Sequence, residues 1–457
     1  MNNIKGRILL LLGALIYGGL LSRVYIDLVS PAFAYMGYVY YSPSSSMVLL
    51  AFAAAALPAL WMPLVVKRPS QVVYWILYVL VYIPASIIPF YTLRMEDGKV
   101  VAFSLSLLAV FAILGASTRL PYLPIRRLEL PPVLFWLGIA LISAVFYGLI
   151  VATYGVRFDV GALSDVYDVR EKYKESGGGL VSYAIAWQSG VINPLIMAYG
   201  LVTRKPGLVA AGLFGQMFIF SITGQKSIFF SLLLNIVLLL LLNRKKSGFG
   251  ISMLYGAAIF TVLCVLVDAF LEDMVLVSLF VRRLILTPGL LTGYYYEFFT
   301  NNPQVHLAHS IFKSFLDYPY TMKPVYVIGY QYMGSASMAA NANLWADSYA
   351  NFGYLGLFVF TMLLGAVLWL FDSITRHCEY QVKCLMLGIP TFALSNSALL
   401  TTLLTHGILL ALILAYILPS IKKKEESEAT FSPEEIWKKS MPLSPVASLS
   451  QYTERDL

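Results

Sequence analysis

Uninterrupted apolar runs constrain this chain more than any other feature of its sequence. The segments 47–66 and 251–270 contain almost no polar side chains. A helix of about 20 apolar residues crosses the hydrocarbon core of a bilayer. Only 12% of the 457 residues are charged, whereas soluble globular proteins carry about 25%. The chain is therefore predicted to be an integral membrane protein.

The runs predict an all-α fold, a polytopic transmembrane helical bundle of about 12 spans within residues 1–420. The run from 384 to 419 is too long for one helix, so we divide it at Ser395, Asn396 and Ser397. The expected spans are 7–23, 46–66, 72–92, 100–118, 132–153, 180–203, 207–223, 227–243, 250–270, 352–372, 384–398 and 400–419. The first run lacks a small-residue cleavage site and is expected to remain as a helix.

The net charge of +8 lies in short clusters between the runs, without the basic stripe and interleaved aromatics that nucleic acid would require. Seventeen cations fall on alternate connections: Lys5, Arg7, Lys67, Arg68, Arg119, Arg126, Arg127, Arg204, Lys205, Arg244, Lys245, Lys246, Arg376, Lys383, Lys422, Lys423 and Lys424. The short connections on the other side carry only Arg23, Arg94, Lys99 and Lys226. The positive-inside rule then predicts a multi-pass protein of the inner (plasma) membrane with both termini cytoplasmic and no nucleic-acid partner.

Residues 421–457 are polar, contain Pro and Ser, and are expected to form a disordered cytoplasmic tail. The chain has three cysteines, which is no disulfide framework. His377, Cys378 and Cys384 do not match a zinc spacing. We expect neither a metal nor a cofactor.

Two predicted outer loops, about 154–179 and 271–351, are too long to be simple connections and are rich in aromatic residues. The first contains a helix signature, with Ser164 as N-cap and glycines 177–179 as the stop. Tyr167, Arg170 and Lys174 share one face of that helix, and Arg157 precedes it. The alternative interpretation is a solvated charged helix above the membrane.

The second loop opens with an apolar segment that contains Arg282 and Arg283. Two arginines there are costly beside lipid unless they face a polar cavity or an anion. The alternative is that they extend toward lipid headgroups. Tyr294, Tyr295 and Tyr296 follow. They indicate either an aromatic belt at the membrane interface or stacking platforms for sugar rings.

Residues 306–317 have the pattern of an amphipathic helix lying in the interface plane. His309 on its polar face is a candidate general base, although histidines at such positions are more often simply exposed. The loop ends with NANLWADSYANFGYLG, whose Asn341, Asn343 and Trp345 are suited to sugar binding. Asp347 is a second candidate base, and its alternative role is a salt bridge to a loop arginine.

Five cations are predicted on the same outer side: Arg157, Arg170, Lys226, Arg282 and Arg283. Arginine forks match phosphate geometry, and aromatic and amide side chains suited to sugars lie nearby in the sequence. Together these groups can bind a lipid-linked pyrophosphate at the outer leaflet without a metal ion.

At these residues the sequence resembles the Wzy-type oligosaccharide repeat-unit polymerases, the O-antigen polymerase family. The likeness rests on the GQKS turn at 224–227, the RR-x10-YYYEFF stretch from Arg282 and the N-x-N-x3-D-x5-G pattern from Asn341. It implies a class C glycosyltransferase fold with two periplasmic loops. It also implies transfer of a growing glycan from one undecaprenyl-pyrophosphate carrier to another lipid-linked repeat unit, with a chain-length regulator as a further partner.

Carried over by position, Arg170, Lys226, Arg282 and Arg283 would hold the pyrophosphates and stabilise the departing charge. Two alternatives remain beside this reading. An O-antigen ligase would use similar groups with a different acceptor, and the outer-loop motifs favour the polymerase. A lipid-linked oligosaccharide flippase would place charges inside its spans, where we find almost none apart from Asp268.

Overall fold

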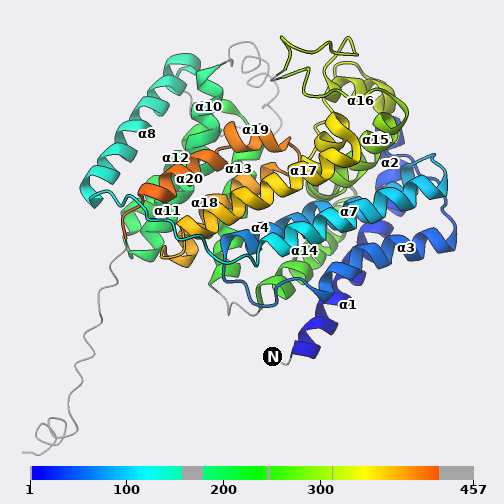
Figure 1. The fold of residues 1–457 in the computed structure, drawn as a ribbon, viewed down its shortest axis with the longest axis horizontal. Helices are drawn as coiled ribbons and strands as arrows, with labels where there is room; N and C mark the ends of the chain where they lie inside the picture. The colour runs from blue at the N-terminus through cyan, green and yellow to red at the C-terminus, as the bar shows by residue number, and fades with distance from the viewer. Residues whose placement is uncertain (1–2, 157–178, 244–247, 311, 421–457) are drawn as a thin grey trace, which may run out of the picture. The chain divides into compact units, whose positions relative to one another are not determined.

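A computed structural model describes residues 3–156, 179–243, 248–310 and 312–420, and every regular element in these ranges is helical (Figure 1). Labels with η denote π-helical or 3-10 segments. The elements are α1 (Asn3–Val24), η1 (Tyr25–Val29), α2 (Ser30–Phe33), η2 (Ala34–Met36), α3 (Ser45–Ala56), η3 (Leu57–Leu60), α4 (Pro69–Leu77), η4 (Tyr78–Tyr82), α5 (Ile83–Ile87), α6 (Pro89–Thr92), α7 (Asp97–Ser117), α8 (Pro132–Tyr154), α10 (Leu180–Trp187), η5 (Gln188–Ile192), α11 (Asn193–Val202), α12 (Pro206–Thr223), α13 (Lys226–Leu242), α14 (Phe249–Leu271), η7 (Val277–Leu286), α15 (Thr287–Asn301), α16 (Pro324–Met333), α17 (Leu344–Ile374), α18 (Tyr380–Ala393), α19 (Leu399–Leu404) and α20 (Ile408–Ile417).

Nine helices in the described ranges are long and apolar enough to cross a membrane. This confirms a polytopic helical membrane protein. The other three predicted spans correspond to shorter helices, namely α3 with η3, α13, and α18. The predicted break near Ser395 is confirmed, because α18 ends at Ala393 and α19 begins at Leu399.

Connections that carry the excess of cations are brought together at one end of the bundle. Arg7 donates to the carbonyl of Met62 (2.6 Å), and Arg68 donates to that of Leu120 (2.6 Å). Arg127 contacts the Cys378 sulfur at 3.1 Å and the carbonyl of Leu418 at 3.4 Å. These contacts join five segments far apart in sequence. The side of the membrane that this end faces is predicted from the charge bias.

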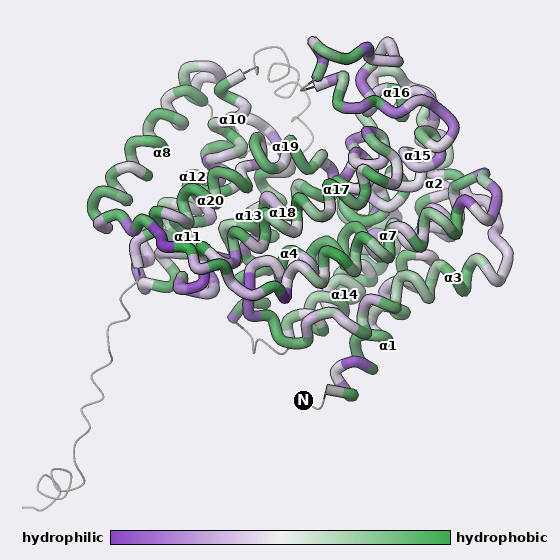
Figure 2. The backbone as a smooth tube through the Cα atoms, in the orientation of Figure 1, coloured by the Kyte–Doolittle hydropathy of each residue, from purple (hydrophilic) through white to green (hydrophobic). Residues whose placement is uncertain are grey.

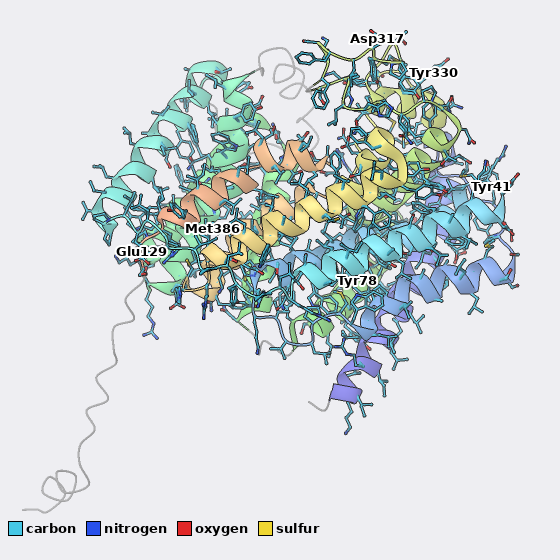
Figure 3. The ribbon with its side chains drawn as sticks, viewed as in Figure 1. Tyr41, Tyr78, Glu129, Asp317, Tyr330 and Met386 are labelled. Carbon is cyan, nitrogen blue, oxygen red and sulfur yellow. The ribbon has the colours of Figure 1, made fainter. Side chains whose placement is uncertain are left out.

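The opposite end contains the predicted outer connections. The main-chain N–H of Arg94 donates to Glu297 (3.0 Å), and the hydroxyl of Tyr296 donates to the carbonyl of Lys99 (2.9 Å). Hydrophilic segments are frequent at this end, around α15 and α16 (Figure 2). Asp317 and Tyr330 mark its edge in Figure 3.

Much of the second predicted loop is helical rather than irregular. η7 and α15 run continuously from Val277 to Asn301, and α15 packs against α5, α6 and α17. A Cβ on Gly289 would lie 2.5 Å from the carbonyl carbon of Pro84, so glycine permits this close approach. Composition did not reveal the helix as part of the bundle, because Arg282 and Arg283 interrupt its hydropathy.

Candidate functional site

The candidate site lies at the end of the bundle formed by η7, α15, the connection 302–323 and the start of α17. Asn343 joins two of these elements. Its side-chain oxygen accepts from the N–H groups of Trp345 and Ala346, both at 3.0 Å, and so caps α17. Its side-chain nitrogen donates to the Pro288 carbonyl (3.0 Å) and the Thr292 hydroxyl (2.7 Å) on α15. The fully buried Asn343 therefore acts as a structural clamp, and no part of it is open to a sugar.

The segment expected to be an amphipathic helix over 306–317 instead forms turns at 306–310 and 312–315. His306 and Leu307 have positive φ angles of 48° and 59°, which a right-handed helix cannot accommodate. The His306 N–H donates to the main-chain oxygen of Asn351 (3.2 Å). The Leu307 N–H donates to the side-chain oxygen of Asn351 (2.8 Å). Asn351 thus accepts hydrogen bonds from the first two N–H groups of the segment that was expected to be helical. These bonds attach the turns to α17.

These turns hold His309 in a half-buried position beside Tyr318, with ring centroids 6.0 Å apart. Its Nδ1 atom is buried and has no hydrogen-bond partner among the described residues. Burial lowers the pKa of His309 below its usual 6.5, and the nearby positive charge of Lys323 lowers it further. The imidazole is therefore neutral at pH 7, which is the state a general base requires.

Asp347 lies in the first turn of α17 and is partly exposed. Between described residues the structure has one ion pair, Arg127 with Glu129, so Asp347 makes no salt bridge within the described part of the chain. The pKa of the Tyr295 hydroxyl is raised, and burial is the main cause. The nearby charge of Asp347 raises this pKa further, and that of Tyr318 contributes less. Since Tyr318 also contacts His309, the two candidate bases border one group of tyrosines.

Arg282 projects from η7 with no carboxylate partner among the described residues. Its guanidinium donates to the Ser278 hydroxyl (2.7 Å) and lies 4.2 Å from the ring centroid of Phe33. The Tyr38 ring is 5.4 Å away. One hydroxyl and two ring faces orient this cation without neutralising it. The neighbouring Arg283 is exposed.

Three of the predicted sugar-binding aromatics are packed inside the protein. Tyr295 donates to the carbonyl of Ala340 (2.8 Å), and Tyr296 contacts the Tyr354 hydroxyl (2.7 Å). The indole of Trp345 donates to the Thr361 hydroxyl (3.1 Å). All three side chains are at most 1% exposed, so no ring face is open to a sugar and the rings are not an interfacial belt either. Buried aromatics instead fix the position of α15 against α17.

The remaining predicted site residues are only partly placed. Asn341 is exposed. Lys226 begins α13, and its side chain lies outside the described residues, as do Arg157 and Arg170 entirely. Within the described ranges, no three His, Cys, Asp or Glu side chains form a group that could hold a metal ion.

Sequence reasoning missed Asn351 and Tyr318, which position the turns and contact His309. The sequence marked neither of them, because both act through partners distant along the chain. No protein-family model, curated protein or solved structure matches this sequence.

Proposed function

We propose that this membrane protein is a metal-independent glycosyltransferase that polymerises lipid-linked oligosaccharide repeat units on the outer side of the membrane. Donor and acceptor would both be carried on undecaprenyl pyrophosphate, and the product would be an O-antigen or related surface polysaccharide. The observation that carries the proposal is Arg282, a cation oriented by Ser278 and Phe33 but without a carboxylate partner among the described residues. Such a group is available to a phosphate oxygen.

In the proposed reaction, the acceptor sugar hydroxyl attacks the anomeric carbon of the donor glycan. The new glycosidic C–O bond forms as the bond to pyrophosphate breaks, and the electron pair leaves with the lipid pyrophosphate. Arg282 and Arg283 stabilise that developing negative charge. The hydroxyl proton passes to a base, and His309 is available because burial and Lys323 keep its pKa below the usual value. Asp347 is the alternative base.

The two sides of the candidate site are connected through Asn343. Pro288, which accepts from Asn343, lies six residues after Arg282 on the continuous helix formed by η7 and α15. Asp347 lies one turn after Asn343 and donates its N–H to the Asn343 carbonyl at 3.0 Å. A phosphate-binding cation and a candidate base are therefore held on elements that are joined by hydrogen bonds.

The decisive experiment replaces Arg282 with Gln and measures glycan chain length, both in cells and with purified protein and lipid-linked repeat units. Loss of one transition-state donor costs about 10²-fold or more in rate, so long chains should disappear while single units still reach the surface. Arg94→Gln is the matched control, since Arg94 also stacks on a tyrosine, Tyr41, at the same end. Arg282→Lys tests whether charge alone suffices, and thermal unfolding checks that each variant folds.

Unchanged chain length in Arg282→Gln would overturn the proposal. Units trapped on the inner face would instead indicate a flippase, and long chains left on polyprenyl pyrophosphate would indicate a ligase. Comparison of His309→Gln with Asp347→Asn then identifies the base, because only loss of the true base should remove the acidic limb of the pH–rate profile.

A further inference from the structure

A lateral groove lies at the opposite half of the bundle from the candidate site. It is an open groove of about 640 Å³ between α8, α11 and α12. Its walls are mostly apolar and include Val133, Trp136, Ile139, Ile196, Tyr199 and Leu208. Lys205 lines one end, beside Pro132 at the start of α8. A groove with these walls at membrane depth suits a hydrocarbon chain.

The groove ends at a hydrogen-bonded polar group near the middle of the spans. Gln188 donates to the Ser143 hydroxyl (3.1 Å) and to the side-chain oxygen of Asn193 (2.8 Å). Tyr147 also donates to that oxygen (3.0 Å). The twelve residues from Gln188 to Tyr199 span about 16 Å at the rise of an α-helix. This matches half of a hydrocarbon core about 30 Å thick, so the groove accommodates a chain from one leaflet.

The cationic end of the groove lies in the turn between α11 and α12. A second cavity of about 450 Å³ lies against the same turn and is lined by both Arg204 and Lys205. Both side chains are exposed, and neither forms an ion pair with a described residue. Arg204 also has a φ of 54°, in the left-handed region that favours glycine. A cation thus occupies a position where another residue type would be less strained.

We infer that this turn and its two cavities bind one anionic phospholipid. The lipid phosphate contacts Arg204 and Lys205, one acyl chain lies in the larger groove and the other lies in the smaller cavity. The lipid comes from the leaflet at the cation-rich end of the bundle, which the charge bias predicts to be cytoplasmic. Charge complementarity selects an anionic headgroup over a zwitterionic one, as for other basic pockets between membrane helices. The inference is independent of the proposed glycosyltransferase activity.

The test uses full-length protein in nanodiscs that contain phosphatidylcholine with a minor fraction of phosphatidylglycerol or cardiolipin. Native mass spectrometry then counts the lipids retained after delipidation. Wild-type protein should retain anionic lipid preferentially. Removal of each charge should weaken retention about fivefold, the value of one cation near an anionic surface. Lys67→Gln is the charge control, because Lys67 is exposed at the same end but lines neither cavity.

Two further variants separate lipid binding from folding. Arg204→Gly removes the charge and relieves the strained φ, so anionic lipid should be lost while thermal stability in pure phosphatidylcholine is unchanged or higher. Ala140→Phe fills the groove without changing its charge and should also remove the lipid. Leu141→Phe, an exposed position on the same helix outside the groove lining, should not.

Equal retention of phosphatidylcholine and phosphatidylglycerol by the wild-type protein would overturn the inference. So would anionic lipid that persists in Arg204→Gly combined with Lys205→Gln. If Ala140→Phe lost the lipid but the variants without Arg204 or Lys205 charge retained it, the groove would bind a chain without headgroup selection. That result would also contradict the inference.

Discussion

Replacement of Asn343 by Ala tests whether α15 and α17 depend on one side chain for their alignment. The substitution removes four hydrogen bonds, two to the N–H groups at the start of α17 and two to α15. Asn343 is 0% exposed, and Trp345 and Ala346 are at most 1% exposed. Water therefore cannot readily replace the lost partners.

The expected cost has two parts. Loss of a helix N-cap costs about 0.5–2 kcal/mol. Loss of the bonds to α15 adds about 1–2 kcal/mol, which is the lower part of the range for buried groups that lose a partner. The cost is low because the Pro288 carbonyl still accepts from the Thr292 hydroxyl at 2.6 Å. Asn343→Ala should thus destabilise the protein by about 1.5–4 kcal/mol. Asn343→Asp keeps the cap but not the donor, so it should lose only the second part, plus any repulsion between its carboxylate and the Pro288 carbonyl.

The measurement is thermal unfolding in a fixed detergent, combined with retention of monodisperse protein after heating. Asn341→Ala is the control, since Asn341 is exposed two residues earlier and should change stability by less than about 0.5 kcal/mol. If Asn343→Ala and Asn341→Ala unfolded at the same temperature, Asn343 would not be the structural clamp described above. An Asn343→Asp variant as stable as the wild-type protein would show that the two bonds to α15 contribute little.

Three further predictions concern the same end of the bundle. Gly353 combines a φ of 58° with a ψ of −140°, a backbone region open almost only to glycine, whereas Gly334 lies in the left-handed region with φ 67° and ψ 12°, so Gly353→Ala should lower the unfolding temperature more than Gly334→Ala. Tyr295→Phe should destabilise by about 1 kcal/mol through loss of one buried hydrogen bond while chain length stays the same; shortened glycan in a stably folded variant would restore a direct role for this ring. Because the pKa of His309 is lowered from 6.5, the unfolded chain binds more protons below that pH, so wild-type stability should fall between about pH 7.5 and 5.5 more steeply than that of His309→Gln. Parallel slopes would contradict the burial of this imidazole.

The membrane-spanning architecture was predictable because a long apolar run has few alternatives to a helix in a bilayer. The same reasoning found the break near Ser395, where polar residues interrupt the run. It did not predict that η7 and α15 form one continuous helix packed against α5, α6 and α17, because hydropathy averages Arg282 with its apolar neighbours. In the structure Phe33 and Ser278 contact the Arg282 side chain. The Phe33 contact is tertiary, and the Ser278 contact depends on the helix geometry.

The candidate site was less predictable, because residue type indicates chemistry but not exposure. Tyr295 and Trp345 are suited to sugar stacking, yet both are buried by partners distant in sequence. The turns around His309 were expected to be helical from their amphipathic pattern. The side chain and carbonyl of Asn351 determine their conformation instead. Asn343 did carry a local signal, since an Asn directly before an apolar run is typical of an N-cap.

The non-helical residues Phe352 and Gly353 inside α17 have a consequence for biosynthesis. The part from Tyr354 to Ile374 is by itself long enough for a hydrocarbon core that takes about 20 residues. It can therefore enter the bilayer as an independent insertion unit, before the turn that carries Asn343 and Asp347 has acquired its partners. The kink thus separates the portion of α17 recognised during membrane insertion from the portion that docks afterwards, so Asp347 need not enter the lipid during synthesis.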